Sequence, residues 1–370
     1  MNLYLFRLDI MITLEKNGHT IIAIIPEGKY SKLIRKYNIE VIDYNLLRGS
    51  LNPIEAIKSI FELKNILKSL DLDLLHTFTV KPNIFGTLAG KMARVPNILN
   101  LVEGLGSFYV DNSLKSKIVR KVIEVSYKNS FKFADKVVFV NKDDPQYLVT
   151  HNILQKKKVK IIKSVGIDTE EYKLDSVSEE KKKNLRQEIG ISKDSKIVVM
   201  IGRAILHKGT VDFYQSAEIL KDKNIEFLFV GGLDDGNKFG MTQKFMESGN
   251  VRWLNWREDI KELIAISDLV VLPSYREGVP RTLLEACSMS KPIIATNTVG
   301  CRETVDDGVN GYLIPIEAPK VLAEKIGIVL SDLELQEKMS RASRKKAEKE
   351  FDIKHIVKQY IELYNKYDKK

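Results

Sequence analysis

Short apolar runs alternate with longer amphipathic segments along the whole chain. Strands are predicted in the first half at 20–25, 39–43, 72–76, 97–102, 136–140 and 159–162. Helices are predicted there at 3–16, 53–70, 82–93 and 113–133. Further strands are expected in the second half at 196–201, 225–230, 251–254, 269–273 and 292–296. This alternation is typical of doubly wound α/β domains, in which helices cover both faces of a mostly parallel sheet.

Two Rossmann-like domains are expected, because 370 residues are enough for two cores of ordinary size. The highly charged segment 173–190 predicts a surface helix leading into the second domain, so we place the domains at 1–170 and 171–350. A last helix, 353–367, carries its apolar residues on one face and therefore needs a partner. Packing on the first domain and capping of the second domain both remain open for residues 351–370.

The beginning of the chain departs from this pattern. It opens with a helix, whereas a doubly wound sheet has its first strand in the interior. Without that strand, backbone N–H and C=O groups would be unpaired in the middle of the sheet, which is costly when they are buried. We therefore expect a truncated start or a compensating rearrangement. In either case the first sheet should show a gap or an abnormal pairing between the strands at 20–25 and 72–76.

The composition narrows the function classes. Lysine and arginine outnumber aspartate and glutamate by 59 to 49, which gives a net charge of +10 and favours an anionic partner. Nucleic-acid-binding motifs are absent, so a phosphorylated substrate or an acidic membrane is preferred. The sequence has no apolar run long enough to span a bilayer, and its start lacks a signal-peptide pattern. Its two cysteines, Cys287 and Cys301, fit a reducing compartment.

The segment 269–289, LVVLPSYREGVPRTLLEACSM, is the most informative for function. An apolar strand ends at Pro273, a loop carries Glu277 and Gly278, and a helix begins near Pro280. Ligands of open α/β sheets bind at the carboxyl edge of the strands, where a helix N-terminus offers N–H groups to an anion. Glu277, and Glu285 eight residues later, offer acceptors to hydroxyl groups. A sugar joined to a diphosphate needs both kinds of group.

A second segment, 196–209, has the same organisation. A strand ends at Gly202-Arg203, and Lys208-Gly209 precede a helix that starts near Thr210. Arginine and lysine at the carboxyl end of a strand can neutralise a diphosphate leaving group. In a chain with many cations Arg203 and Lys208 could also be ordinary exposed loop residues. The small residue before Arg203, and the Lys-Gly pair before the helix, favour the functional interpretation.

Together these motifs resemble the retaining, GT-B-fold nucleotide-sugar glycosyltransferases of glycosyltransferase family 4. The resemblance extends to two further segments, Ala134-Asp135-Lys136-Val137-Val138 and Ser164-Val165-Gly166-Ile167-Asp168. Members that act on polyprenyl-diphosphate-linked sugars, in particular the N-acetylgalactosamine transferases of bacterial N-linked protein glycosylation, are similar at four further places. These are 76–83, 103–109, 130–134 and Ser50-Leu51-Asn52-Pro53. In this fold the C-terminal helix often crosses back to the first domain.

The resemblance implies a UDP-N-acetylhexosamine donor, with UDP-GalNAc preferred, and an undecaprenyl-diphosphate-linked sugar as acceptor. The enzyme would act at the cytoplasmic face of the inner membrane as a peripheral protein. Arg203 and Lys208 would stabilise the leaving diphosphate, Glu277 would hold sugar hydroxyls and Glu285 the ribose. Backbone contacts to the nucleotide sugar are expected at Gly202, Gly278, Val279, Pro280 and, for uracil, near Trp256-Arg257. No cofactor and no metal are expected, and Asp71-Leu72-Asp73 is interpreted as a helix–strand junction.

The acceptor is expected in the first domain, at His76, Lys81 and Gly104. Many family members have a histidine where this chain has Glu103, so the histidine's role cannot be carried over. Glu103 is instead a candidate for orienting the acceptor or acting as a general base. His76 could equally be a polar lining residue or a structural support.

The helix 113–133 combines lysines with apolar residues. Such a basic amphipathic helix could lie on an anionic membrane, or pack on the sheet with a solvated basic face. Electrostatic attachment through Lys115 to Lys132 would weaken at high salt.

Two other functions remain open at this point. A UDP-sugar 2-epimerase-like isomerase shares the fold and would need no lipid acceptor. An inactive binding protein is compatible with the unusual start.

Overall fold

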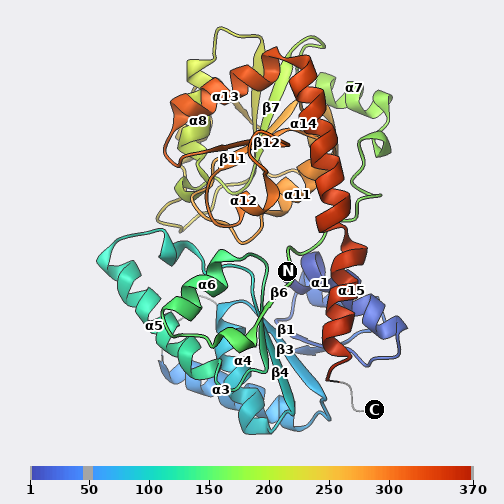
Figure 1. The fold of residues 1–370 in the computed structure, drawn as a ribbon, viewed down its shortest axis with the longest axis vertical. Coiled ribbons are helices and arrows are strands. Elements are labelled where there is room, and N and C mark those ends of the chain that lie inside the picture. Colours follow the sequence, from blue (N-terminus) through green and yellow to red (C-terminus); the bar gives the residue numbers. More distant parts are fainter. Residues whose placement is uncertain (1, 45–52, 368–370) are drawn as a thin grey trace. The chain divides into compact units, whose positions relative to one another are not determined.

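The chain divides into two units, each with its own sheet and core. The computed structural model describes residues 2–44 and 53–367, so the predicted likeness at 50–52 lies outside the described residues. Unit 1 comprises the described residues up to Gly166 and those from Ile353 on, and unit 2 runs from Ile167 to Asp352. Both units have parallel strands with helices in the connections, which confirms the two predicted Rossmann-like α/β folds (Figure 1).

Unit 1 contains the predicted strands and helices close to their expected positions. Its strands are β1 (Ile22–Ile25), β2 (Glu40–Asp43), β3 (Leu74–Phe78), β4 (Asn97–Val102), β5 (Lys136–Phe139) and β6 (Val159–Ile161). Its helices are α1 (Asn2–Lys16), α2 (Lys29–Ile34), α3 (Pro53–Lys68), α4 (Val80–Ala93), α5 (Leu114–Ser130), α6 (Asp143–Thr150) and α15 (Ile353–Tyr364). Helix α3 packs against α4 and α4 against α5, so the three form one layer (Figure 1). Helix α15 packs beside α1.

The sheet of unit 1 is interrupted between β1 and β3. Strands β3 to β6 form a four-stranded parallel sheet, whereas β1 and β2 pair only with each other among the described residues. Met11 of α1 packs with Ala23, Ile34 and Ile39 in a small core of its own. The predicted gap is therefore present, and it separates β1–β2 from the main sheet.

Unit 2 is built around one six-stranded parallel sheet with the order β12-β11-β10-β7-β8-β9. Its strands are β7 (Lys196–Ile201), β8 (Ile225–Val230), β9 (Val251–Trp253), β10 (Leu269–Leu272), β11 (Ile293–Thr296) and β12 (Gly311–Ile314). Its helices are α7 (Glu179–Glu188), α8 (Thr210–Ile219), α9 (Gln243–Met246), α10 (Ile260–Ile266), α11 (Arg281–Ser288), α12 (Cys301–Thr304), α13 (Pro319–Ser331) and α14 (Leu333–Lys346). Helix α7 lies within the charged segment 173–190 but is shorter than the helix predicted there, and β12 was not predicted.

Strands β7 and β10 are neighbours at the centre of this sheet, although β8 and β9 come between them in the sequence. The strand order runs outward in opposite directions from this pair. Open α/β sheets bind ligands at such a switch point, beyond the carboxyl ends of the strands. The topology thus brings the two predicted donor motifs to one edge of one sheet.

Candidate active site

The loops that follow β7 and β10 are joined by hydrogen bonds to one backbone carbonyl. The carbonyl of His207 accepts from the Tyr275 N–H at 2.9 Å and from the Ser274 hydroxyl at 3.1 Å. The loop carrying Arg203 and Lys208 is therefore held against the loop carrying Glu277.

Two glycines permit close packing of the loops at this edge of the sheet, Gly209 after β7 and Gly300 after β11. Gly209 has a positive φ of 76°, and a Cβ there would lie 2.1 Å from the Pro273 carbonyl oxygen. Gly300 has a φ of 84°, and a Cβ there would lie 2.4 Å from the Gly278 carbonyl oxygen. Side chains at these positions would meet backbone that cannot yield, so only glycine fits without displacing the loops.

Lys208 and Glu277 form an ion pair where the loops after β7 and β10 meet. The Lys208 ammonium donates to Glu277 Oε1 at 2.6 Å, and the two side chains are 22% and 12% exposed. An ammonium is a donor to phosphate oxygens, and a carboxylate is an acceptor for sugar hydroxyls. The structure thus places a hydrogen-bond donor directly beside an acceptor where the two loops meet, and the phosphate and sugar roles of Lys208 and Glu277 stay predictions.

Arg203 lies farther out, with its side chain 62% exposed. Its guanidinium donates to Asp234 Oδ2 at 2.6 Å, and the same oxygen accepts from Asn237 at 2.9 Å. An exposed pair of this kind contributes little to stability, so Arg203 can exchange Asp234 for another anion at small cost. The turn at Asp234-Asp235-Gly236 therefore lies next to a predicted donor-site residue.

The other predicted donor residues at this edge of the sheet contribute backbone groups. The Gly202 N–H donates to the Val230 carbonyl at 2.9 Å, which fixes the end of β7 beside β8. Gly278, Val279 and Pro280 form the loop before α11, whose first residue is Arg281. Pro280 is the residue that caps this helix, one position before the first turn where the sequence favoured it.

Glu285 is buried instead of lining an open surface. Its Oε1 accepts from Arg281 Nε at 2.9 Å, one helical turn earlier in α11. Burial raises the pKa of Glu285, although Arg281 and Tyr172 both favour its charged form. Sequence reasoning missed Arg281, which the i, i+4 spacing could have indicated. The ribose-binding role of Glu285 stays a prediction.

The guanidinium of Arg257 is engaged by two carboxylates. It donates to Asp259 at 2.6 Å and to Glu188 at 2.8 Å, and these bonds raise the pKa of Arg257. Beside it, the Asn255 carbonyl accepts from the Gly231 N–H at 2.8 Å, which holds this segment at the end of β8. Its side chain being occupied, Arg257 would meet uracil through backbone groups, and this assignment also stays a prediction.

In unit 1, Glu103 is held by two residues of α1. Its carboxylate accepts from Arg7 Nη2 at 2.6 Å and from the Asn2 amide at 2.7 Å. Arg7 is buried and also lies over the rings of Phe78 and Tyr360. Arg7 was missed by the sequence analysis. Its signal is a charge at the first position of the buried i, i+3, i+4, i+7 pattern that Ile10, Met11 and Leu14 continue.

His76 points toward α15, where its Nδ1 hydrogen-bonds the Tyr364 hydroxyl. Burial, and then the charge of Arg7, lower the pKa of His76 to about 3, so the ring is neutral at physiological pH. This contact favours the structural alternative for His76. Gly104 directly follows Glu103, and Lys81 is half-buried in the first turn of α4. Acceptor binding by these residues stays a prediction.

Two family models match the chain. The model for glycosyl transferases group 1 matches residues 181–346, and the glycosyl transferase 4-like model matches residues 2–141. The chain is also 38% identical, over 99% of its length and 96% of the relative's, to the N,N'-diacetylbacillosaminyl-diphospho-undecaprenol alpha-1,3-N-acetylgalactosaminyltransferase of Campylobacter jejuni. The chain belongs to the family-4 glycosyltransferases. It is accordingly a hexosyltransferase.

Other relatives of this family-4 glycosyltransferase are more distant. A UDP-Gal:alpha-D-GlcNAc-diphosphoundecaprenol alpha-1,3-galactosyltransferase of Escherichia coli is 26% identical over 85% of the chain and 81% of the relative. Among solved structures, a glycosyltransferase from Rickettsia africae superposes with a TM-score of 0.83 at 23% identity, covering 99% of this chain and 95% of that one. Anabaena Alr3699/HepE in complex with UDP-glucose gives 0.80 at 22%, covering 98% and 95%. These likenesses confirm the GT-B fold.

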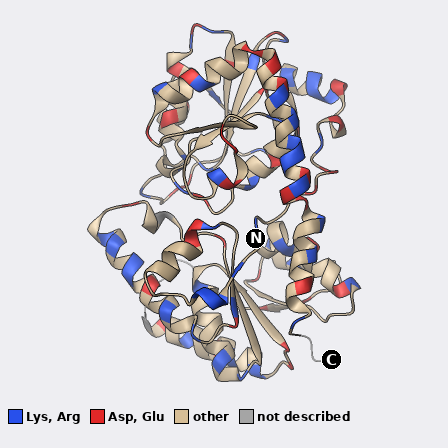
Figure 2. Ribbon diagram, in the orientation of Figure 1, with Lys and Arg blue, Asp and Glu red and all other residues tan. Residues whose placement is uncertain are grey.

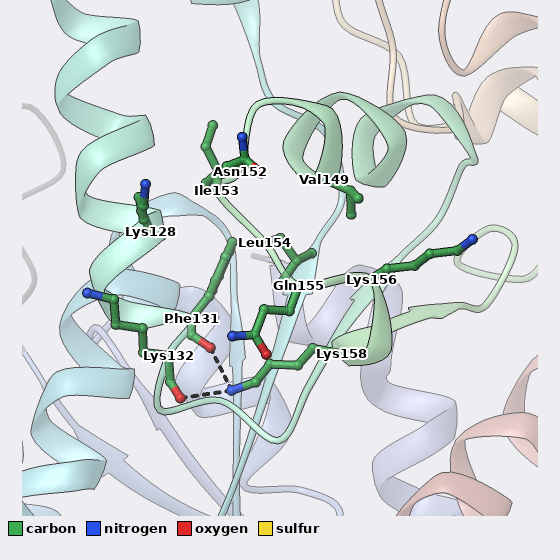
Figure 3. Close-up of a pocket in the computed structure, with 10 residues that line it drawn as sticks. All are labelled: Lys128, Phe131, Lys132, Val149, Asn152, Ile153, Leu154, Gln155, Lys156 and Lys158. Carbon is green, nitrogen blue, oxygen red and sulfur yellow. Dashed lines mark hydrogen bonds between the residues drawn. The ribbon is translucent and has the colours of Figure 1, made fainter.

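A pocket of about 420 Å³ lies elsewhere in this family-4 glycosyltransferase, where the connections before β5 and β6 approach the end of α5 (Figure 3). It is at the amino edge of the strands, whereas Glu103 follows the carboxyl end of β4. The Lys158 ammonium donates to the carbonyls of Phe131, Lys132 and Ala134 at 2.7–3.0 Å. Lys158 therefore caps the end of α5, and the pocket is not part of the donor site.

Within residues 2–44 and 53–367, no cluster of three or more histidine, cysteine, aspartate or glutamate residues is placed to hold a metal ion. The helices in the same ranges lack the combination of length and hydropathy that crossing a membrane requires.

Proposed function

We propose that this hexosyltransferase moves an N-acetylhexosamine, with GalNAc as the expected sugar, from UDP to a sugar linked to undecaprenyl diphosphate. The observation that supports a nucleotide-sugar donor is the Lys208–Glu277 pair. It brings a group suited to phosphate within 2.6 Å of a group suited to sugar hydroxyls. The acceptor half is supported by the relatives from C. jejuni and E. coli, whose names both specify sugars on diphosphoundecaprenol.

Loss of UDP places developing negative charge on the β-phosphate. Lys208 and Arg203 would stabilise this charge, together with backbone groups around Gly278 to Pro280. Glu277, released from Lys208 by the diphosphate, would accept hydrogen bonds from the sugar hydroxyls. Glu285, kept in place by Arg281, would hold the ribose. Because protein cations neutralise the diphosphate, transfer is expected to need no divalent metal.

The acceptor hydroxyl attacks the anomeric carbon of the donor sugar, and the bond between that carbon and the β-phosphate oxygen of UDP breaks. The hydroxyl proton passes to the departing phosphate, and the configuration is retained because attack and departure occur on one face. Glu103, whose oxygens are engaged by Arg7 and Asn2, suits orientation of the acceptor better than proton abstraction. Since the acceptor's lipid is embedded in a bilayer, the enzyme is placed as a peripheral protein at the cytoplasmic face of the inner membrane.

The test is incubation of the full chain with radiolabelled UDP-GalNAc and undecaprenyl-diphosphate-linked diacetylbacillosamine. Label should move into the lipid fraction in the presence of EDTA, and faster than from UDP-GlcNAc or UDP-glucose. A preference for another donor would correct the sugar assignment alone. Conversion of the UDP-sugar without any lipid product would instead indicate an isomerase, and activity lost in EDTA but restored by manganese would contradict the proposed charge stabilisation.

A further inference from the structure

Helix α5 exposes four of its large apolar residues. Leu114, Ile118, Val122 and Val125 are 75%, 57%, 60% and 49% exposed. Its buried residues are Ser116, Glu124, Tyr127 and Ser130. Ile123 and Tyr127 on the inward side pack in the core of unit 1, so an inward apolar surface already holds the helix on the protein. The outward stripe therefore needs a different explanation.

The four exposed residues form one continuous stripe. At 100° per residue their positions i, i+4, i+8 and i+11 fall within an arc of about 80°. At the same 100° per residue, exposed lysines border this arc, Lys115 on one side and Lys117, Lys121 and Lys128 on the other. Figure 2 shows the Lys and Arg positions as blue bands along α5. Within α5 the one acidic residue, Glu124, is buried, where it accepts from the Tyr147 hydroxyl at 2.7 Å. Lys128 in the last turn of α5 and Lys132 just after the helix line the pocket in Figure 3.

Helix α3 carries a shorter stripe of the same kind. Ile54, Ile57 and Phe61 are exposed, at spacings that place them on one face, and Lys58 is exposed beside them. Because α4 packs against both helices, α3 and α5 flank it in one layer.

The lysines that border the stripe indicate which kind of partner can cover it. In a symmetric dimer the same surface would meet itself, so the lysine rows of two copies would face each other and repel. A bilayer rich in anionic lipid offers both parts of the match, since acyl chains accept the apolar arc and lipid phosphates accept the lysines. Lysine stems can also lie along the apolar layer while their ammonium groups reach the phosphates.

We propose that α5 lies in the headgroup layer of an anionic bilayer, with Leu114, Ile118, Val122 and Val125 immersed and α3 as a second contact. This inference rests on the proposed function, which requires access to a lipid-linked acceptor. It replaces the purely electrostatic attachment expected from the sequence, because an immersed stripe contributes a component that salt does not screen.

Docking through α5 also acts on the candidate acceptor loop. Arg120 of α5 donates to the Phe108 carbonyl through Nε at 3.0 Å and Nη2 at 2.7 Å, and its guanidinium lies over the Tyr109 ring. The Phe108 segment continues directly from Glu103 and Gly104. A bilayer that positions α5 thus positions the loop where the acceptor is expected.

The test is sedimentation of the full chain with vesicles of phosphatidylglycerol and phosphatidylethanolamine, at low and high salt. Binding should weaken at high salt without being abolished, and it should be much weaker on phosphatidylcholine vesicles. Ile118→Glu with Val122→Glu should lower binding at least about tenfold at both salt concentrations. Lys117, Lys121 and Lys128 changed to Gln should lower it on the order of a hundredfold at low salt only.

The matched control is Ile219→Glu with Leu333→Glu, two comparably exposed apolar residues of unit 2. This variant should bind vesicles like the wild type. Vesicle binding unchanged by Ile118→Glu with Val122→Glu would overturn the proposal. So would a wild-type dimer, detected by light scattering, that the same variant dissociates.

Transfer to a short-chain, water-soluble analogue of the acceptor separates this proposal from the proposed function. The stripe variant should retain wild-type turnover on that analogue and lose it on acceptor in vesicles. A chain that transfers sugar to the analogue but ignores anionic vesicles would refute docking and leave the function intact. Vesicle binding without transfer to either acceptor would refute the proposed function and leave the docking proposal intact.

Discussion

Lys208 and Glu277 are 69 residues apart in the chain, yet their side chains meet at 2.6 Å. The contact exists because β7 and β10 are neighbours and their following loops are joined at the His207 carbonyl. A diphosphate that engages Lys208 competes with Glu277 for the same ammonium. With the proposed roles of these residues, binding of the leaving group would be linked to release of the Glu277 carboxylate.

Arg203→Ala is expected to slow transfer about a hundredfold with little change in KM for the donor, because charge on the leaving group grows at the transition state. Steady-state kinetics check this, with Lys221→Ala as the control. Lys221 is an exposed cation of the same unit and pairs with Glu218 on the surface. A loss confined to KM would show that Arg203 only binds the ground state.

Glu285→Gln is expected to weaken UDP binding about tenfold, because an amide accepts hydrogen bonds from the ribose less strongly than a carboxylate. Titration calorimetry with UDP measures the effect. The amide keeps the shape of the side chain beside Arg281, and thermal unfolding of the same sample tells lost affinity from lost folding. An unchanged affinity would remove the ribose assignment.

Arg7→Met should destabilise the chain by about 3 kcal/mol, because it leaves the largely buried Glu103 carboxylate without its cation. Arg35→Met breaks the pair with Asp43, whose side chains are 40% and 39% exposed, and should cost under about 1 kcal/mol. Urea unfolding of the two variants provides the comparison. Equal losses would mean that burial of Arg7 does not strengthen its pair.

His76 should make stability depend on pH. Its folded pKa of about 3 lies below the value of about 6.5 expected in the unfolded chain. The unfolded state therefore binds more protons between these values, so His76 contributes stability that is present above about pH 6.5 and lost as the pH falls toward 3.

The check is the urea midpoint from about pH 4 to 7, where the wild type should show a steeper slope than His76→Gln. His355→Gln, an exposed histidine of α15, should keep the wild-type slope. Identical slopes for the wild type and His76→Gln would contradict the assignment.

Local patterns predicted the strands from β1 to β11 and the two strand–loop–helix motifs, because apolar periodicity and such a signature are readable within a short window. Long-range pairing was not readable: nothing near Glu103 indicates Arg7, and nothing near Arg203 indicates Asp234. The direction of α5 was also undetermined. Its apolar residues lie on two faces, and the structure shows that Ile123 packs in the core whereas Leu114, Ile118, Val122 and Val125 are exposed.

The separation of β1 and β2 from the main sheet bears on local opening. In the described part of unit 1, backbone hydrogen bonds do not tie these strands to β3, and their core of Met11, Ala23, Ile34 and Ile39 is small. Residues 22–43 can therefore unfold as a cooperative segment while β3 to β6 stay intact. Their amide protons should exchange with solvent well before those of β4, so this corner of the molecule would be the first to yield to a protease.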